Sequence, residues 1–238
     1  MANSWRGWAG DGGAGGGLRE ARGACSCADD EAGSGDADRY QAGGGWWGDV
    51  GPGVGQIVEE ALPPEMLSAQ VARDVRPFCP RFNAIGEADK RAFWAYFFQA
   101  LAGAEAGLKP TSQVRHTEPE VAVKDEVTGV AVRSAGLLQL TYEDAKRYGC
   151  DFNWETDRTL KANDPAKTIL QPKNNLECGV KILDQQIIGQ HKPLLSRTGY
   201  WSTLRPGTVS YRVFVKQMAN VPVACGVRAK PVRRDAER

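Results

Sequence analysis

The chain has 238 residues, of which 42% are hydrophobic, and carries a formal net charge of +1 with a pI near 7.6. This length accommodates one domain of ordinary size plus an extension, or two small domains. The balanced charge gives no electrostatic reason to expect a nucleic-acid or acidic partner. No stretch approaches the roughly 18–20 apolar residues of a membrane span, and the first residues lack the apolar core of a recognisable secretory signal.

Composition divides the chain into four parts. Residues 1–55 hold most of the 28 glycines and few branched apolar side chains, which predicts a low-complexity, disordered extension. Residues 56–78 are expected to form a linker with a short helix. The compact domain is predicted over residues 79–225, where it is long enough to bury a core. Residues 226–238 are expected to be a basic, flexible tail.

Four of the six cysteines lie in the predicted domain, at Cys79, Cys150, Cys178 and Cys225. An even number at wide intervals indicates two disulfides in an oxidising compartment, or reduced core residues. The favoured pairing joins Cys79 to Cys225, which ties the ends of the domain, and Cys150 to Cys178; two other connectivities remain open. Because no CxxC or other metal-ligand spacing is present, no metal or cofactor is expected.

The first helix of the domain is predicted over residues 88–106. Apolar residues recur at helical spacing on one face, and Gly107 is a typical helix stop. Glu105 lies in register with that face, four residues after Leu101. Such a carboxylate is either turned into solvent past the end of the helix or buried with a raised pKa, and the second case makes Glu105 a candidate general acid.

A loop with a possible β-hairpin is expected over residues 109–133. It carries several carboxylates, of which Glu118 is the candidate for a second catalytic carboxylate. Further along the chain, four helices are expected, and the resulting fold class is mainly α with at most a small β element. These helices are a two-turn helix between Thr141 and Gly149, a longer one capped by Asn174 or Asn175 that ends at Gly189, and helical pieces at 194–204 and 209–218.

Three segments in a fixed order resemble a known family: AEAGLKP, which contains Glu105; GLLQ, from Gly136 to Gln139; and NLECGVKIL, which begins at Asn175. Together they resemble the soluble-type lytic transglycosylases (SLT domain) of the lysozyme-like superfamily. The resemblance covers about residues 79–225 and implies a lysozyme-like α+β domain.

The resemblance also implies a reaction. Members cleave the β-1,4 bond between N-acetylmuramic acid (MurNAc) and N-acetylglucosamine (GlcNAc) in peptidoglycan. Glu105 would act first as acid and then as base, and the muramic C6 hydroxyl would close a 1,6-anhydro ring. The implied partner is the peptidoglycan glycan strand, which places the protein in the periplasm or otherwise outside the cytoplasm.

Four residues are expected to contact the substrate. Gln139 carries an amide that suits an N-acetyl group or the orientation of Glu105, and Gly136 lets backbone or sugar approach closely. Asn175 either caps a helix or binds the substrate. Tyr200 is expected to replace the family's usual tyrosine, which contacts the catalytic glutamate and is missing here with its Ala-Tyr-Asn-Ala-Gly segment; Tyr211 is the other candidate.

The sequence departs from the family pattern at Ala106, where members usually have a serine whose hydroxyl hydrogen-bonds the catalytic carboxylate. Two alternatives therefore stand beside the transglycosylase. One is a hydrolytic lysozyme that uses Glu105 with a loop carboxylate such as Glu118. The other is a peptidoglycan-binding or cell-envelope assembly module without turnover.

Overall fold

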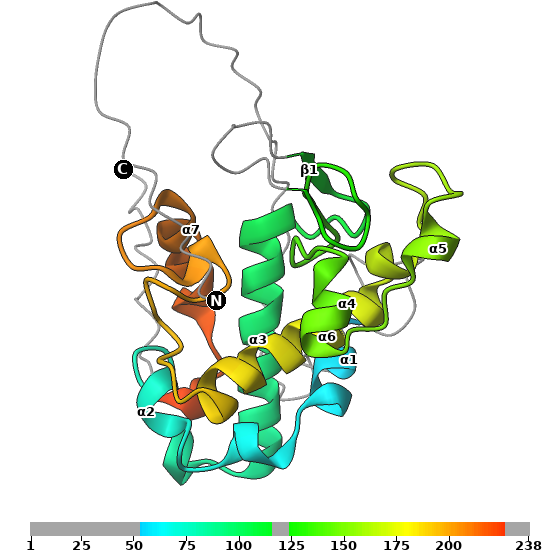
Figure 1. Cartoon of the computed structure of the whole chain (residues 1–238). Helices are drawn as coiled ribbons and strands as arrows, with labels where there is room; N and C mark the ends of the chain where they lie inside the picture. The colour runs from blue at the N-terminus through cyan, green and yellow to red at the C-terminus, as the bar shows by residue number, and fades with distance from the viewer. Residues whose placement is uncertain (1–52, 116–123, 227–238) are drawn as a thin grey trace, which may run out of the picture. The chain divides into compact units, whose positions relative to one another are not determined.

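The computed structural model describes residues 53–115 and 124–226. Almost all of the predicted Gly-rich extension and tail, and Glu118, lie outside these ranges. Within them, the chain is mainly helical with one small sheet, as predicted (Figure 1). The elements are α1 (Val54–Ala61), α2 (Ala72–Val75), α3 (Glu87–Ala106), β1 (Gln113–Arg115), β2 (Arg133–Ala135), α4 (Glu143–Tyr148), α5 (Trp154–Asp157), α6 (Pro172–Asp184) and α7 (Val209–Gln217).

Helix α3 is the centre of the domain. It runs through the middle of the described body, with α7 on one side and the sheet, α4 and α6 on the other (Figure 1). The sequence predicted an amphipathic helix, but side chains around most of its circumference are buried, including Phe93, Trp94 and Phe98 at 0% exposure. A helix that is apolar on all sides belongs in the core of a protein. Because the core holds this helix on several sides, its last turn has a fixed position.

Residues 54–78, most of which were expected to form a linker, pack into the same core. Val58 and Met66 are fully buried, and the indole Nε1 of Trp94 donates a 2.9 Å hydrogen bond to the carbonyl of Met66. Helix α1 contacts both α3 and α6. The physical reason is burial, since the apolar residues on either side of Pro63 and Pro64 cover helix α3.

The predicted β element is a two-stranded antiparallel sheet. Strand β1 pairs with β2 so that Val114 lies opposite Ser134, and a further bridge joins Lys124 to Ala131. The helical piece expected at 194–204 is reduced to a single 3₁₀ turn, Ser202–Leu204. Gly199 interrupts this stretch, and Pro193 and Pro206 lie on either side of it, which explains why no longer helix forms there.

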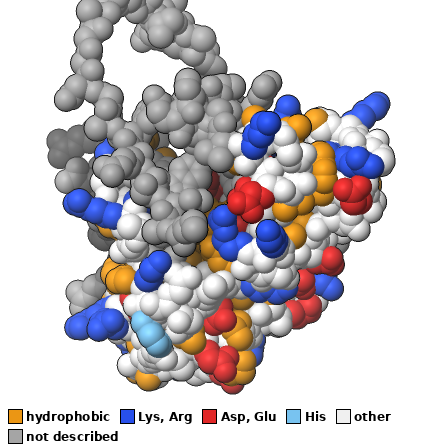
Figure 2. Space-filling view, viewed as in Figure 1, with side chains coloured by type: hydrophobic (Ala, Val, Ile, Leu, Met, Phe, Trp, Pro, Cys, Tyr) orange, Lys and Arg blue, Asp and Glu red, His pale blue; other side chains and the backbone are white. Residues whose placement is uncertain are grey.

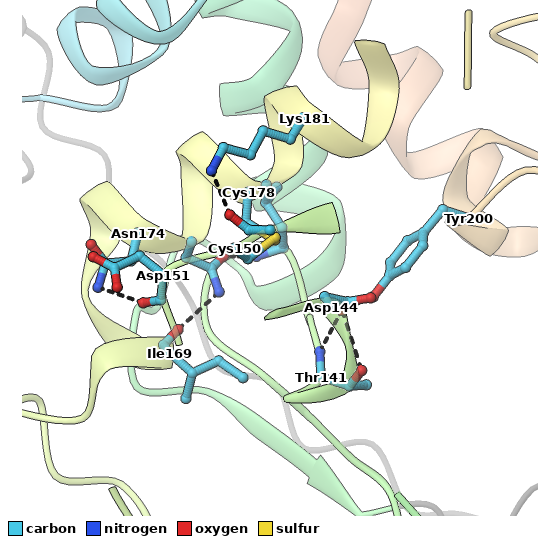
Figure 3. Close-up of a disulfide and its surroundings, with 12 residues drawn as sticks. Thr141, Asp144, Cys150, Asp151, Ile169, Asn174, Cys178, Lys181 and Tyr200 are labelled. Carbon is cyan, nitrogen blue, oxygen red and sulfur yellow. Dashed lines mark hydrogen bonds between the residues drawn. A yellow bond between two sulfur atoms is a disulfide. The ribbon is translucent and has the colours of Figure 1, made fainter. Parts of the chain in front are cut away.

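Two disulfides close the domain, with the predicted pairing. Cys79 is bonded to Cys225 and Cys150 to Cys178. The first joins residues 146 positions apart and the second joins α6 to the end of α4 (Figure 3). Paired cysteines of this kind indicate an oxidising environment outside the cytoplasm.

The surface of the described part carries interspersed positive and negative side chains. Figure 2 shows charges of both signs spread over one face without a large field of a single sign, in keeping with a net charge of +1. Among the described helices, none combines the length and the apolar character that crossing a membrane requires.

Candidate functional site

The three segments that carry the family resemblance meet where α6 crosses α3. Gly179 of α6 approaches so closely that an added Cβ would lie within 3.0 Å of the Leu138 side chain and 3.2 Å from the Phe98 ring. Phe98 belongs to α3, which carries Glu105, and Leu138 belongs to the GLLQ segment. A glycine is therefore required at position 179, because any larger residue would push the other two segments apart.

Glu105 lies in the last turn of α3. The helix ends at Ala106, and Gly107 adopts a left-handed conformation with φ of 58°. One carboxyl oxygen, Oε1, is buried and receives no hydrogen bond from any described residue. The carboxyl group does receive a hydrogen bond from the side chain of Thr203. Glu105 therefore has a partly desolvated carboxyl group with one free oxygen.

Burial changes the chemistry of this group. Loss of hydration raises the pKa of Glu105 to about 7, and the hydrogen bond from Thr203 opposes only part of this rise. The negative end of the α3 dipole acts in the same direction as desolvation, since it disfavours a carboxylate in the last turn. A carboxyl group with a pKa near neutrality can both give and take a proton at physiological pH, as general acid–base catalysis requires.

The raised pKa has a measurable consequence for stability. In the unfolded chain Glu105 ionises near its ordinary value of 4.5, and in the folded protein near 7. The folded state therefore binds the proton more tightly. This contribution is complete below pH 4.5 and is lost as the pH rises to about 7, at a cost on the order of 3 kcal/mol. In urea unfolding from pH 4 to 8, we expect wild type to lose stability relative to Glu105→Gln over this interval. A constant difference would contradict the assignment.

The GLLQ segment is held by Asn175. The carboxamide oxygen of Asn175 accepts a 2.8 Å hydrogen bond from the Leu138 backbone, and its nitrogen donates to the carbonyls of Ala135 (3.2 Å) and Ile169 (3.0 Å). Asn175 is 0% exposed and lies inside α6, which begins at Pro172. It is neither the predicted helix cap nor accessible to a substrate, and its role is to fix the loop.

Gly136 is required by the same arrangement. Its φ is +79°, and a Cβ there would lie within 3.0 Å of the Asn175 carboxamide and of the Ile169 carbonyl. The predicted close approach at Gly136 is therefore real, and the group that approaches is the Asn175 side chain.

Gln139 follows in a left-handed backbone conformation with φ of 52°, which is uncommon for a residue other than glycine. Its Nε2 donates to the Gly136 carbonyl at 2.8 Å, and the side chain is 9% exposed. Its Oε1 is buried and accepts no hydrogen bond from any described residue. A strained backbone and an unused acceptor together are typical of a binding position.

Tyr200 has a different partner from the predicted one. Its hydroxyl donates a 2.5 Å hydrogen bond to Oδ2 of Asp144, which is completely buried (Figure 3). The Thr141 backbone and hydroxyl donate to the same oxygen at 2.9 and 3.2 Å. Burial raises the pKa of Asp144, and the Tyr200 and Thr141 hydrogen bonds oppose that rise. Tyr200 thus anchors its segment to α4 through Asp144, and its hydroxyl is directed to that carboxylate and not to Glu105.

Thr203 is the site residue that sequence reasoning missed. It lies in the 3₁₀ turn Ser202–Leu204, is 1% exposed, and supplies a hydroxyl to Glu105. Thr203 therefore supplies the hydroxyl that a serine at position 106 would give, from 97 positions further along the chain. Trp201 positions this turn by donating a 2.7 Å hydrogen bond from Nε1 to the Leu138 carbonyl. Trp201 is 3% exposed and is a core residue.

We expect Thr203→Val to raise the pKa of Glu105 further. The substitution keeps the shape of the side chain and removes the hydroxyl that stabilises the carboxylate, which is worth about 1 kcal/mol. The alkaline limb of the pH–activity profile should move upward by about half a pH unit or more. Thr203→Ser keeps the hydroxyl and should leave the profile in place. An unmoved profile in Thr203→Val would show that Thr203 is only a packing residue.

No protein-family profile and no curated protein matches this chain in sequence. Its fold does match solved structures of a protein named DslA (Bd0314). The wild-type structure is 25% identical with a TM-score of 0.57, and the match covers 75% of this chain and 96% of that one. A variant with one glutamate replaced by glutamine is 26% identical at the same TM-score. A second such variant, 23% identical with a TM-score of 0.55, supports the fold alone.

Together with the mainly helical body and the small antiparallel sheet, these matches agree with the predicted lysozyme-like α+β fold. The glutamine variants show that glutamates of DslA were singled out for substitution. In this chain, the residues at the end of the central helix and in the loops beside it define the candidate site: Glu105, Thr203 and the Gly136–Gln139 segment.

Proposed function

We propose that this protein is a peptidoglycan lytic transglycosylase in which Glu105 is the only acid and base. The observation that carries the proposal is the position of Glu105, which is desolvated at the end of the central helix with a pKa of about 7. The protein would act on glycan strands outside the cytoplasm, in agreement with its two disulfides.

The reaction needs no other titratable group. Protonated Glu105 gives its proton to the glycosidic oxygen, and the bond between that oxygen and C1 of MurNAc breaks. The resulting Glu105 carboxylate then takes the proton of the C6 hydroxyl of the same sugar. The C6 oxygen bonds to C1, the 1,6-anhydro ring closes, and Glu105 is again protonated. Thr203 would hold the carboxyl group through both steps, and Gln139 Oε1 offers an acceptor to the N–H of a substrate N-acetyl group.

The hydrolytic alternative requires a second carboxylate near Glu105. Of the loop carboxylates, Glu118 lies outside the described residues. Asp125 accepts two backbone hydrogen bonds in its own turn, and the Glu126 side chain is 75% exposed and pairs with Lys146 at 3.6 Å. None of these contacts joins Asp125 or Glu126 to Glu105. The described residues therefore give no observation that favours a lysozyme.

The test is mass spectrometry of the products released from purified sacculi. Muropeptides that end in 1,6-anhydroMurNAc support the proposal. Products with reducing MurNAc ends would replace it with the lysozyme, and binding without release would replace it with a non-catalytic binding module.

A further inference from the structure

A pocket lies between the two-stranded sheet and the loops that follow α4. Its volume is about 220 Å³, which suits one amino-acid residue or one sugar ring. Glu105, Gln139 and Thr203 do not line it, so it is separate from the candidate catalytic site. Its lining is apolar except for a few charged and polar groups, the usual composition of a ligand site. The residues used below are Asp125, Arg133, Ala135, Tyr142, Trp154 and Lys167.

Lys167 is the first sign that the pocket takes a ligand. The residue as a whole is 7% exposed, and no described residue accepts a hydrogen bond from its ammonium group or forms an ion pair with it. The nitrogen itself keeps contact with solvent, so it is available to an anion that enters the pocket. Arg133, which is exposed at the rim, adds a second positive charge. The pocket therefore offers two positive charges to an anionic group of a ligand.

A carboxylate lines the same pocket. Asp125 is 2% exposed, and its Oδ1 accepts hydrogen bonds from the backbones of Val127 (2.9 Å) and Thr128 (2.8 Å). No described residue donates to its Oδ2. The pocket thus combines a free acceptor with the cations of Lys167 and Arg133, a pattern complementary to a ligand that carries both a carboxylate and an N–H donor.

Two aromatic rings form an apolar wall. Tyr142 and Trp154 pack edge to face with their ring centres 5.0 Å apart. The Tyr142 hydroxyl is occupied by Asp157 at 2.9 Å, so Tyr142 offers the pocket its ring and not a free hydroxyl. A short aliphatic group would fit against these rings.

The pocket adjoins the loop of the candidate catalytic site. Ala135 lines the pocket, and the next residue is Gly136, the first of the GLLQ segment. The Ala135 carbonyl accepts the hydrogen bond from Asn175 that also fixes that segment. A substrate whose sugar lies over Gln139 and whose side branch carries a carboxylate would therefore have this pocket within reach.

We propose that the pocket binds a carboxylate-bearing amino-acid residue of the peptide side chain that branches from MurNAc. The inference rests on the proposed function, since it takes peptidoglycan as the substrate. The peptide carboxylate lies against Lys167 and Arg133, a peptide N–H faces Asp125 Oδ2, and a small aliphatic group contacts Tyr142 and Trp154.

The first test measures binding alone, so it does not depend on catalysis. The probe is the free peptide side chain, released from sacculi with an amidase and titrated into the full-length protein by calorimetry. We expect Lys167→Met to weaken binding about tenfold or more, because it removes the charge-assisted contact with the peptide carboxylate. Lys161→Met, at an exposed position in the same loop, should bind as wild type does. A peptide with amidated carboxylates should also bind wild type weakly. Its affinity for wild type should equal that of the unmodified peptide for Lys167→Met.

The second test compares cleavage of strands with and without peptides. Wild type should prefer peptide-bearing strands, and Lys167→Met should lose that preference while it cleaves naked strands at the wild-type rate. Equal peptide binding by wild type and Lys167→Met, or an unchanged preference, would overturn the inference. If wild type cleaves neither substrate, the result counts against the proposed function and not against the pocket. The binding measurement would then still show whether the pocket binds the peptide.

Two further variants keep the test decisive if Lys167→Met does not fold. Asp125→Asn retains the Oδ1 that accepts from Val127 and Thr128 and changes only the atom that faces the peptide. Arg133→Gln alters an exposed side chain. Both should weaken peptide binding with the unfolding midpoint unchanged, and wild-type affinity in both would overturn the assignment.

Discussion

Glu105→Gln is expected to lower the rate of glycan cleavage by roughly 10²- to 10⁴-fold, the usual contribution of a general acid or base. Glutamine has nearly the same shape and can still accept the hydrogen bond from Thr203, but it has no proton to give at neutral pH and cannot take one up. Since Glu105 acts in both steps, the loss should appear in the turnover number more than in KM. The measurement is the initial rate of anhydromuropeptide release from sacculi.

Glu155→Gln is the matched control for this variant. The Glu155 side chain is 75% exposed and forms a surface ion pair with Arg158 at 3.0 Å. It should cleave sacculi at the wild-type rate. Retention of more than about a tenth of wild-type activity by Glu105→Gln would contradict a general acid at this position. Intact binding of sacculi by the variant would show that its fold is preserved.

Removal of the Cys79–Cys225 disulfide should have the largest effect on stability. Both cysteines are fully buried, and the bond closes a loop with a sequence separation of 146. The entropy of a loop of this length in the unfolded chain corresponds to about 5 kcal/mol. A Cys79→Ala, Cys225→Ala double variant should lower the free energy of unfolding by up to about this amount, as urea titration would show.

The second disulfide supplies the comparison. Cys150–Cys178 closes a separation of only 28 residues, for which the same argument gives roughly 3.5 kcal/mol. The alanine pair at these positions should therefore be the more stable of the two double variants. The opposite order would mean that local packing in the folded state, and not the length of the closed loop, determines the effect.

Several elements of the fold could be predicted because they depend on local signals. Helix α3 has a run of apolar residues and ends at Gly107, a residue that readily adopts the left-handed conformation found there. The cysteine pairing followed from the idea that a domain is tied at its ends. The position of Glu105 in the last turn of α3 also followed from this local pattern.

Other predictions failed because burial by distant segments outweighed the local signal. Residues 56–78 were expected to form a linker with a short helix. A helix is present there as α1, but Val58, Met66 and Val71 are buried and cover the core. Asn175 is typical of a helix cap, but the helix begins earlier, at Pro172, and a proline in the first helical turn was the signal that could have placed it.

The role of Thr203 could not be predicted from local patterns. It lies in a short turn with no periodic pattern, and its contact with Glu105 joins residues 98 positions apart. Only the packing of Trp201 against the GLLQ segment brings this turn to the end of α3. Contacts of this kind depend on the three-dimensional arrangement of elements that are remote in sequence.

This long separation in sequence also determines when the candidate site can form during synthesis of the chain. The ribosome completes α3 and the GLLQ segment well before it reaches Trp201 and Thr203. Until those residues emerge and pack, Glu105 lacks its contact with the Thr203 turn and is more hydrated, so the pKa of its carboxyl group lies closer to the ordinary value of 4.5. The candidate site is therefore complete only after the segment that contains Thr203 has been synthesised and has packed against Glu105.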